Sequence, residues 1–287
     1  MPENKLPEED ARERMDYASY LALDRLLALQ VPQSRPDVAD ETLFIAVHQI
    51  SELWFKLVLH ELTGAIRDLA ADLLLPAAKH LARCQAIFNQ LGGVWQVLET
   101  LTPSDYRSFR AALGAASGSG SFQFHAIEYA MGWRESKDPD WGVYSEDTRA
   151  WLLGWYERPS LYESFVASLE RLGYPVPRSI KRATDQPDPA LEAVFEMVYR
   201  APGAHWAVYE TAEKLMDLEE AVQLWRFRHV RAVERIIGHL PGTGGTSGVT
   251  YLIATLERRF FPAIRSVRVR LYGPTPHPDA RPGKCPL

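Results

Sequence analysis

The sequence predicts an all-α fold, a helical bundle, and two observations support this. Through most of the 287 residues, apolar side chains recur at spacings of three and four, the period of a helix that buries one face. Alternation of apolar and polar residues over the length of a strand is hard to find. With 46% apolar residues, the chain can bury a substantial core. We expect one helical domain over residues 17–272, between a flexible segment at 1–16 and a disordered, proline-containing tail at 273–287.

The first three helices follow from their apolar stripes and end signals. Residues 17–30 form a first helix with apolar positions at helical spacing. Asp40 is interpreted as the N-cap of a second helix that runs to about residue 72, because its carboxylate can accept hydrogen bonds from unpaired amides. A third helix covers about 76–101.

A fourth helix starts at Thr102, which can cap it, with Pro103 in the first helical position and Asp105 in the first turn. The serine- and glycine-rich stretch 114–121 then indicates a flexible loop over a site. The later elements are, in order, a helix at 121–132, a surface excursion at 133–144, helices at about 146–155 and 159–172, a loop at 181–189, a long helix after about 203, a glycine-rich turn from Gly242 to Gly248, and a helix at about 247–260 stopped by Pro262.

Composition excludes several classes of protein. A formal net charge of −5 argues against a general nucleic-acid-binding surface. Neither a membrane span nor a signal peptide is supported, because no run of about 18 uncharged apolar residues occurs and the N-terminus is acidic and polar. The two cysteines, Cys84 and Cys285, provide no disulfide framework and no metal-ligand spacing. We expect a cytoplasmic protein.

His229 is the most informative residue because it lies in the apolar stripe of the long helix, where a leucine would pack. Such a histidine is more often a core residue bonded to a neighbouring carbonyl, and alternating arginines are more often a solvated or ion-paired face. Together with the glycine turn, however, the arrangement also suits an anionic, planar, iron-bearing ligand. The flanking arginines are Arg226, Arg228, Arg231 and Arg235.

Two other helices carry candidate site residues. Phe44, His48 and Ser51 share one helical face because they are four and three residues apart. Tyr106 and Arg110 are also four apart, so that a phenol and a guanidinium project together, and an arginine there can fork onto a carboxylate. A structural histidine and an ordinary ion pair remain the alternatives.

Together, these segments resemble the tryptophan 2,3-dioxygenase family, a group of all-helical haem enzymes, from about Tyr17 to Leu271. The matching strings are YASYLALDRLLALQ, DETLFIAVHQISELWFKLVLHEL, LETLTPSDYRSFR and LEEAVQLWRFRHVRAVERIIGHLPGTGGTSGV. The resemblance implies that His229 is the axial ligand of a haem b iron, with the opposite face of the porphyrin open to oxygen. It also implies that Trp95 lies at the haem edge and that the arginines flanking His229 help to hold the macrocycle.

The resemblance also implies a set of substrate-binding residues. His48 would bond the indole NH on the distal side, and Phe44 would form a wall of the indole pocket. Arg110 would bind the substrate carboxylate with support from Tyr106, while Thr243 would contact the ammonium group.

Further residues are implied at the distal side and between subunits. Ser117 would lie near the distal oxygen and the indole. Tyr17, Tyr20 and Leu21 align with a helix that such enzymes donate to a neighbouring subunit's pocket, which implies a homotetramer built from intimate dimers. The activity implied is haem-dependent cleavage of the indole C2–C3 bond of L-tryptophan or a close derivative, with O2 bound to ferrous haem as co-substrate and an N-formylkynurenine-type product.

One departure from the family keeps a second oxygenase hypothesis open. Where the family reads close to SGFQS, this chain has Ser119 and Gly120 in place of an aromatic residue and a glutamine, and His125 replaces an arginine. The lost volume would accommodate a modified substrate such as β-methyl-L-tryptophan, converted by a monooxygenase paralogue to an oxindole-type product. More remote hypotheses are a non-catalytic haem sensor or carrier and a plain helical interaction protein.

Overall fold

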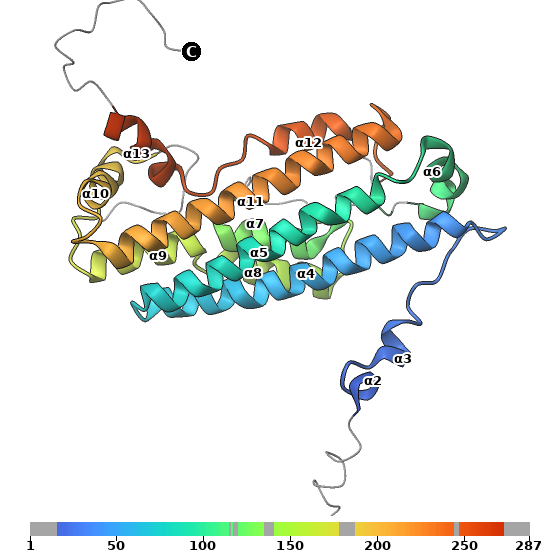
Figure 1. The fold of residues 1–287 in the computed structure, drawn as a ribbon, viewed down its shortest axis with the longest axis horizontal. Coiled ribbons are helices and arrows are strands. Elements are labelled where there is room, and N and C mark those ends of the chain that lie inside the picture. Colours follow the sequence, from blue (N-terminus) through green and yellow to red (C-terminus); the bar gives the residue numbers. More distant parts are fainter. Residues whose placement is uncertain are drawn as a thin grey trace, which may run out of the picture.

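The computed structural model describes residues 16–114, 116, 120–134, 141–177, 187–243 and 247–272. Within these ranges all regular structure is helical, which confirms the predicted all-α class. The helices (Figure 1) are α2 (Tyr17–Tyr20), α3 (Leu23–Leu26), α4 (Ala39–Ala70), α5 (Leu74–Leu98), α6 (Pro103–Phe109), the 3-10 turn η1 (Arg110–Leu113), α7 (Phe122–Met131), α8 (Glu146–Glu157), α9 (Leu161–Arg171), α10 (Pro189–Arg200), α11 (Trp206–Ile237), α12 (Val249–Thr255) and α13 (Pro262–Tyr272).

Three long helices form the body of the molecule, with α5 packed between α4 and α11 (Figure 1). Helices α7 and α9 pack against α4, α12 lies along the C-terminal part of α11, and α10 pairs with α13 at the far end. The core is built from their apolar stripes and includes Leu62, Leu91 and Leu218, each with no exposed surface. Because α4, α5 and α11 converge toward α6, side chains from all four helices meet at that end of the bundle.

Helix α4 is, by length and composition, the one helix among the described residues that would be apolar enough to cross a membrane. Its packed face, however, carries the buried carboxylates of Glu61 and Asp68. His80 of α5 bridges them, with its Nδ1 2.5 Å from Glu61 and its Nε2 3.4 Å from Asp68. Gly64 permits this contact, since a Cβ there would lie 2.6 Å from the His80 ring. These polar contacts identify α4 as a helix of the bundle.

Several predicted boundaries are wrong, for identifiable reasons. The expected single helix at 17–30 is broken into α2 and α3 because Ala22 adopts a left-handed conformation with φ of 50°. Asp40 is not the cap of α4. The N-cap is Val38, in an extended conformation and without a side-chain cap bond, and Asp40 lies in the first helical turn. There an acidic side chain still stabilises the helix dipole.

Two prolines begin helices that the sequence analysis did not anticipate. Pro262 was expected to stop a helix, but it is the first residue of α13. Pro189, expected to close a loop, opens α10, with the carboxylate of Asp188 accepting the amides of residues 190 and 191. Proline suits the first turn because the amide it lacks would be unpaired there. The predicted flexible segment, apart from Asp16, and the predicted tail lie outside the described residues.

Candidate functional site

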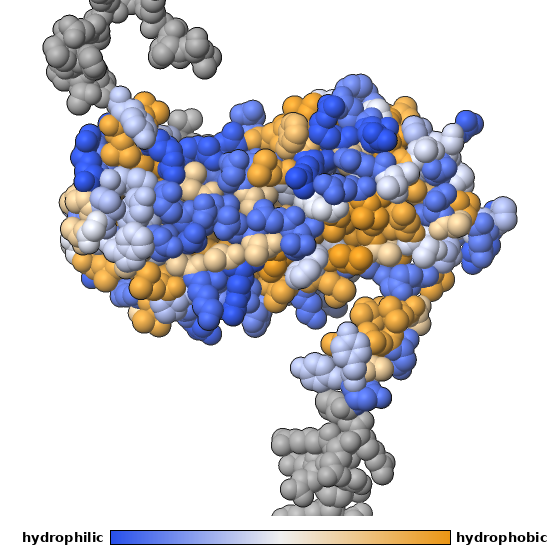
Figure 2. Space-filling view, in the orientation of Figure 1, coloured by the Kyte–Doolittle hydropathy of each residue, from blue (hydrophilic) through white to orange (hydrophobic). Residues whose placement is uncertain are grey.

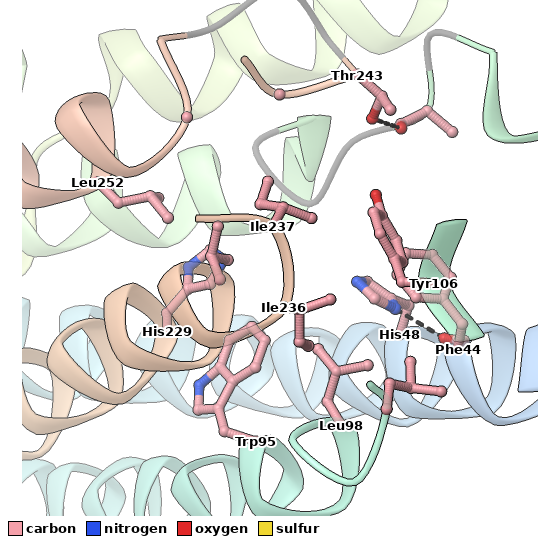
Figure 3. Close-up of a pocket in the computed structure, with 15 residues that line it drawn as sticks. Phe44, His48, Trp95, Leu98, Tyr106, His229, Ile236, Ile237, Thr243 and Leu252 are labelled. Atoms are coloured by element: carbon pink, nitrogen blue, oxygen red, sulfur yellow. Dashed lines mark hydrogen bonds between the residues drawn. The ribbon is translucent and has the colours of Figure 1, made fainter. Parts of the chain in front are cut away.

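A cavity with about 730 Å³ of empty space lies where α4, α5, α6 and α11 converge, under the turn that leads into α12 (Figure 3). Leu98, Ile236, Ile237 and Leu252 provide apolar wall surface. Six residues singled out from the sequence line the cavity: Phe44, His48, Trp95, Tyr106, His229 and Thr243.

His229 faces this cavity from α11, with its ring stacked on Trp95 at a centroid separation of 4.3 Å and an interplanar angle of 8°. Burial, together with the nearby charge of His48, lowers the pKa of His229 to about 3, so the imidazole is neutral at neutral pH. Among the described residues, neither ring nitrogen has a hydrogen-bond partner. His229 is therefore not the carbonyl-bonded core histidine of the alternative interpretation, and a neutral imidazole is the form that binds a metal.

The surroundings of His229 fit a haem. Trp95 is buried, and its indole nitrogen has no hydrogen-bond partner among the described residues. Trp225 adds a second aromatic ring 5.7 Å from the His229 ring. Figure 3 shows His48 on the opposite side of the cavity from His229, with Ile236 between them at one side. A single neutral nitrogen ligand, flat aromatic neighbours and apolar walls are what a haem iron and its macrocycle require.

His48 presents a hydrogen-bond acceptor to the cavity. Its Nδ1 is 2.7 Å from the carbonyl oxygen of Phe44, and a carbonyl can only accept, so Nδ1 carries the hydrogen. Burial lowers the His48 pKa, although the Phe44 carbonyl and the charge of Glu52 act in the opposite direction. The neutral ring therefore leaves Nε2 with a free lone pair, and Figure 3 shows this nitrogen turned into the cavity. Phe44 itself packs 4.1 Å from the His48 ring.

Glu52 is a neighbour of His48 that the sequence analysis missed. It lies four residues further along α4, on the same face. Gln123 of α7 holds it by donating its side-chain amide both to the Glu52 carboxylate at 2.8 Å and to the Glu52 backbone carbonyl at 2.9 Å. The spacing from His48 was the only available signal, because Gln123 is 71 residues away in sequence.

The polar residues at the mouth of the cavity come from two distant segments. Arg110 Nη2 donates to the Pro241 carbonyl at 2.8 Å, and Thr243 Oγ1 donates to the Ala116 carbonyl. Burial raises the pKa of Tyr106, although the adjacent Arg110 acts in the opposite direction. Tyr106 and Thr243 line this end of the cavity, whereas Arg110 does not line it and is bonded beside it to Pro241, which precedes the lining residue Gly242.

The N-terminus of α6 is fixed by its capping residues. Thr102 accepts the Asp105 amide, and the Asp105 carboxylate accepts the Thr102 amide at 2.8 Å, which forms a reciprocal capping box with Pro103 in the first turn. This is the N-terminus predicted from the sequence. It fixes the helix that carries Tyr106 and leads into Arg110.

Three predicted site residues are not brought to this cavity by the chain's own fold. Tyr17 and Tyr20 lie on α2, which projects from the bundle (Figure 1), and are 77% and 73% exposed. Leu21, at the end of α2, is 40% exposed. Ser117 lies outside the described residues.

Among the described residues, two of the four arginines flanking His229, Arg226 and Arg231, have ion-pair partners. Arg226 is buried and bonds Glu128, Arg231 bonds Glu234 at 2.5 Å, and Arg228 lies across Gly92, where its Nη1 would be 2.9 Å from an added Cβ. At Arg226 and Arg231, the ion-paired interpretation is confirmed. The expectation that Arg226 faces the macrocycle is corrected, because Glu128 holds its guanidinium instead.

Glu128 is the centre of a buried ion cluster in a second cavity. Among the described residues, this cavity shares only His229 and Leu252 with the first. Glu128 Oε1 accepts Arg226 at 2.5 Å and Arg258 at 2.7 Å, and its Oε2 is 3.5 Å from His125 Nδ1. Burial alone would raise the Glu128 pKa, but the His125 hydrogen bond and the two guanidinium charges outweigh it and lower the pKa to about 2. The cluster joins α7 to α11 through Arg226, which lies three residues before His229 on α11.

The fold and the cavity define an all-helical haem protein, with one imidazole available to the iron and a second imidazole facing it. Comparison with known proteins identifies the family. The profile described as Tryptophan 2,3-dioxygenase matches residues 3–173 and 181–269. The chain is 45% identical over 271 residues to the tryptophan 2,3-dioxygenase of Myxococcus xanthus (strain DK1622), covering 93% of each protein.

A second relative is the tryptophan 2,3-dioxygenase of Caulobacter vibrioides (strain ATCC 19089 / CIP 103742 / CB 15), 46% identical over 90% of this chain and 98% of that protein. A third, from Bacillus anthracis, is 45% identical over 91% of this chain and 95% of that protein. The chain belongs to the tryptophan 2,3-dioxygenase family. The resemblance inferred from its motifs is confirmed, and with it a haem cofactor and oxygen as co-substrate.

Proposed function

We propose that this chain is a haem-dependent dioxygenase that cleaves the C2–C3 bond of the indole ring of L-tryptophan to an N-formylkynurenine-type product. The observation that carries this proposal is the pair of neutral imidazoles on opposite walls of one cavity, His229 without a protein partner among the described residues and His48 with its acceptor nitrogen turned inward. Membership of the family supports the same activity.

His229 would hold the haem iron through a ring nitrogen, and Trp95 and the apolar walls would pack against the macrocycle. When bound, the haem iron supplies the binding and redox chemistry of O2. The chain's own residues bind and orient the substrate and exclude water from the reacting carbons. Leu98, Ile236 and Ile237 contribute the apolar surface that keeps water out.

The proposed substrate pose follows from hydrogen-bonding roles. His48 Nε2 accepts the indole NH, the only strong donor of that ring, while Phe44 packs against its face. Arg110 binds the carboxylate as a fork with Tyr106 beside it, and Thr243 binds the ammonium end. Arg110 already donates to a carbonyl oxygen at the mouth, so it presents N–H donors where the carboxylate enters. The Thr243 hydroxyl hydrogen goes to the Ala116 carbonyl, which leaves the oxygen lone pairs of Thr243 to accept from the ammonium.

Other parts of the proposal concern Ser117 and the quaternary structure. Ser117 completes the distal side near oxygen and the indole. Tyr17, Tyr20 and Leu21 enter the pocket of a neighbouring subunit in a cytoplasmic homotetramer. Their exposure in the single chain supports this, because three large apolar side chains on one projecting segment are costly to leave in water.

The monooxygenase alternative has no specific support. Ser119 lies outside the described residues, and His125, offered as a lost charge beside the substrate, lines the second cavity and contacts Glu128. Mass spectrometry under isotopically labelled oxygen distinguishes the two reactions. We expect two labelled oxygens in the product of L-tryptophan. One labelled oxygen, with preference for β-methyl-L-tryptophan, would overturn the proposal.

A further inference from the structure

The N-terminal arm, defined here as residues 16–27, exposes an apolar surface that its own chain does not cover. Tyr17, Tyr20 and Leu27 are 77%, 73% and 70% exposed. In Figure 2 the arm projects from the body with apolar surface on display, and Figure 1 shows that it leaves from beside the N-terminal end of α4. A projecting arm can reach a defined site on another molecule only if its exit direction is fixed.

The first fixed point is a buried carboxylate, Glu41, in the first turn of α4. It is 1% exposed, and its two oxygens accept the backbone amides of Gln33 at 2.8 Å and Ser34 at 2.9 Å. Ser34 is itself buried, and its hydroxyl accepts the Val38 amide at 3.1 Å. Hydrogen bonds to a charged acceptor are the stronger kind, so the connecting segment 28–38 is held firmly on α4.

The second fixed point is Gln49, on the same helix. Its amide donates to the Leu29 carbonyl at 3.0 Å, and its carbonyl accepts the side chain of Gln30. Gln30 also donates back to the Leu26 carbonyl at 3.1 Å, which ties the connecting segment to the end of α3. Gln49 is thus bonded to the connecting segment immediately before it becomes the arm.

Two fixed points on one rigid helix determine a direction. Glu41 and Gln49 are eight residues apart, roughly 12 Å along α4 and close to the same face. Phe44 and His48 lie between them in sequence and line the cavity. The direction in which the arm leaves the body is therefore fixed by α4, the helix that also carries the proposed substrate-binding residues Phe44 and His48.

We propose that Glu41 and Gln49 are positioning residues for the substrate pocket of the neighbouring subunit, because they set the angle at which Tyr17 and Tyr20 leave their own chain. This rests on the proposed function, in which the arm completes a second copy's pocket. It predicts an effect in trans. A substitution at Glu41 alters the pocket that receives the arm and leaves the pocket of the substituted chain intact.

The test uses mixed oligomers of two full-length, differently tagged chains, isolated through both tags. The acceptor chain carries Tyr17→Ala and Tyr20→Ala with an intact pocket, and the donor chain carries Arg110→Ala with an intact arm. We expect the mixed oligomers to recover tryptophan turnover at low substrate concentration, with a KM lower than that of either variant alone. Adding Glu41→Gln to the donor should raise the KM of the recovered activity roughly tenfold, the loss expected for a charged hydrogen bond.

The position of the substitution separates positioning from a structural role. Glu41→Gln in the acceptor should leave the recovered KM unchanged, although the working pocket belongs to that chain. Asp40→Asn in the donor is the matched control, since this neighbouring carboxylate lies in the same helical turn and should also have no effect. Gln49→Ala in the donor should reproduce the Glu41→Gln result and provides a second test if Glu41→Gln does not fold.

The outcomes are distinct. If the unmodified donor does not restore turnover, the proposed donation of the arm is wrong. If donors with and without Glu41→Gln restore turnover with the same KM, arm donation stands and the positioning role is wrong. An equal loss when Glu41→Gln is in the acceptor would make Glu41 a structural residue of its own pocket and would also overturn the inference.

Discussion

His229 is the residue on which the proposed cofactor site depends. We predict that His229→Ala purifies without stoichiometric haem, because no other described side chain on that wall of the cavity offers a neutral nitrogen to iron. The measurement is the haem Soret absorbance per protein chain. His60→Ala, on the exposed face of α4, is the control and should retain full haem content. Full haem content in His229→Ala would show that the axial assignment is wrong.

Arg110 is predicted to select amino acids over other indoles. Arg110→Ala should raise the KM for L-tryptophan roughly 10- to 100-fold, the loss expected for hydrogen bonds to a charged group. It should leave the binding of tryptamine, which lacks the carboxylate, almost unchanged. Binding constants for the two ligands test this directly. Arg107→Ala, an exposed neighbour on α6, is the matched control, and equal losses for both ligands would contradict a carboxylate-binding role.

At this scale, local spacing grouped Phe44 with His48, and the family resemblance added Trp95 and Thr243, but neither predicted the distant polar partners. Phe44 and His48 are one helical turn apart, so their shared face could be predicted from the sequence and is confirmed. The partner of Glu128 on α11 is 98 residues away, and that of Arg110 is 131 residues away. No periodicity relates such pairs, because the topology of the bundle brings them together.

Among the elements, α12 begins at a tightly constrained glycine, Gly248. Gly248 has φ of 62°, and an added Cβ would lie 2.5 Å from the Leu240 carbonyl oxygen, a backbone atom that cannot easily move. We predict that Gly248→Ala costs about 1–3 kcal/mol and displaces Thr243, which lowers tryptophan affinity. Thermal unfolding and a tryptophan binding curve measure the two effects.

Gly93 provides the opposite case in the interior of α5. Its added Cβ would meet no heavy atom within 4 Å, and its backbone is helical. Gly93→Ala should therefore stabilise the protein by up to about 1 kcal/mol. If Gly93→Ala destabilised the protein as much as Gly248→Ala, the cost at Gly248 could not be assigned to its backbone conformation and close contact.

The junction of α7 with α11 is predicted to be sensitive to acid. The pKa of Glu128 in the folded protein is lowered from 4.5 to about 2, so its contribution to stability is complete above 4.5 and is lost as the pH falls toward 2. Glu128→Gln should destabilise the protein by about 3–5 kcal/mol at neutral pH, since two buried guanidinium groups lose their anion. Urea unfolding at several pH values should show a flatter acid profile for the variant.

The helices illustrate which sequence signals are reliable. The stripe of α4 predicted a helix from 40 to about 72, and the observed bounds are Ala39–Ala70. Helices α10 and α13 were missed because Pro189 and Pro262 were interpreted as breakers, although each lies in the first helical turn. Ala22 interrupts the first predicted helix without any proline or glycine signal. The pattern of apolar residues specifies long packed helices well and short, exposed ones poorly.

For the whole molecule, we predict an assembly held together in part by the N-terminal arm. Sedimentation velocity should show a species larger than one chain, and Tyr17→Ala/Tyr20→Ala should shift it toward smaller species or reduce tryptophan affinity. The physical reason is the large apolar area that the arm leaves exposed in a single chain. Full activity from a monomer would rule out shared pockets.

The N-terminal arm also has a consequence for the order of synthesis, folding and association. It is the first helical part of the described chain to be synthesised, and under the proposed donation its apolar side chains are covered only after a second chain has folded. Until then the nascent chain exposes an apolar, aggregation-prone segment. Its charged residues Asp16, Asp24 and Arg25 oppose aggregation. Synthesis of neighbouring chains on one messenger would shorten this exposed period.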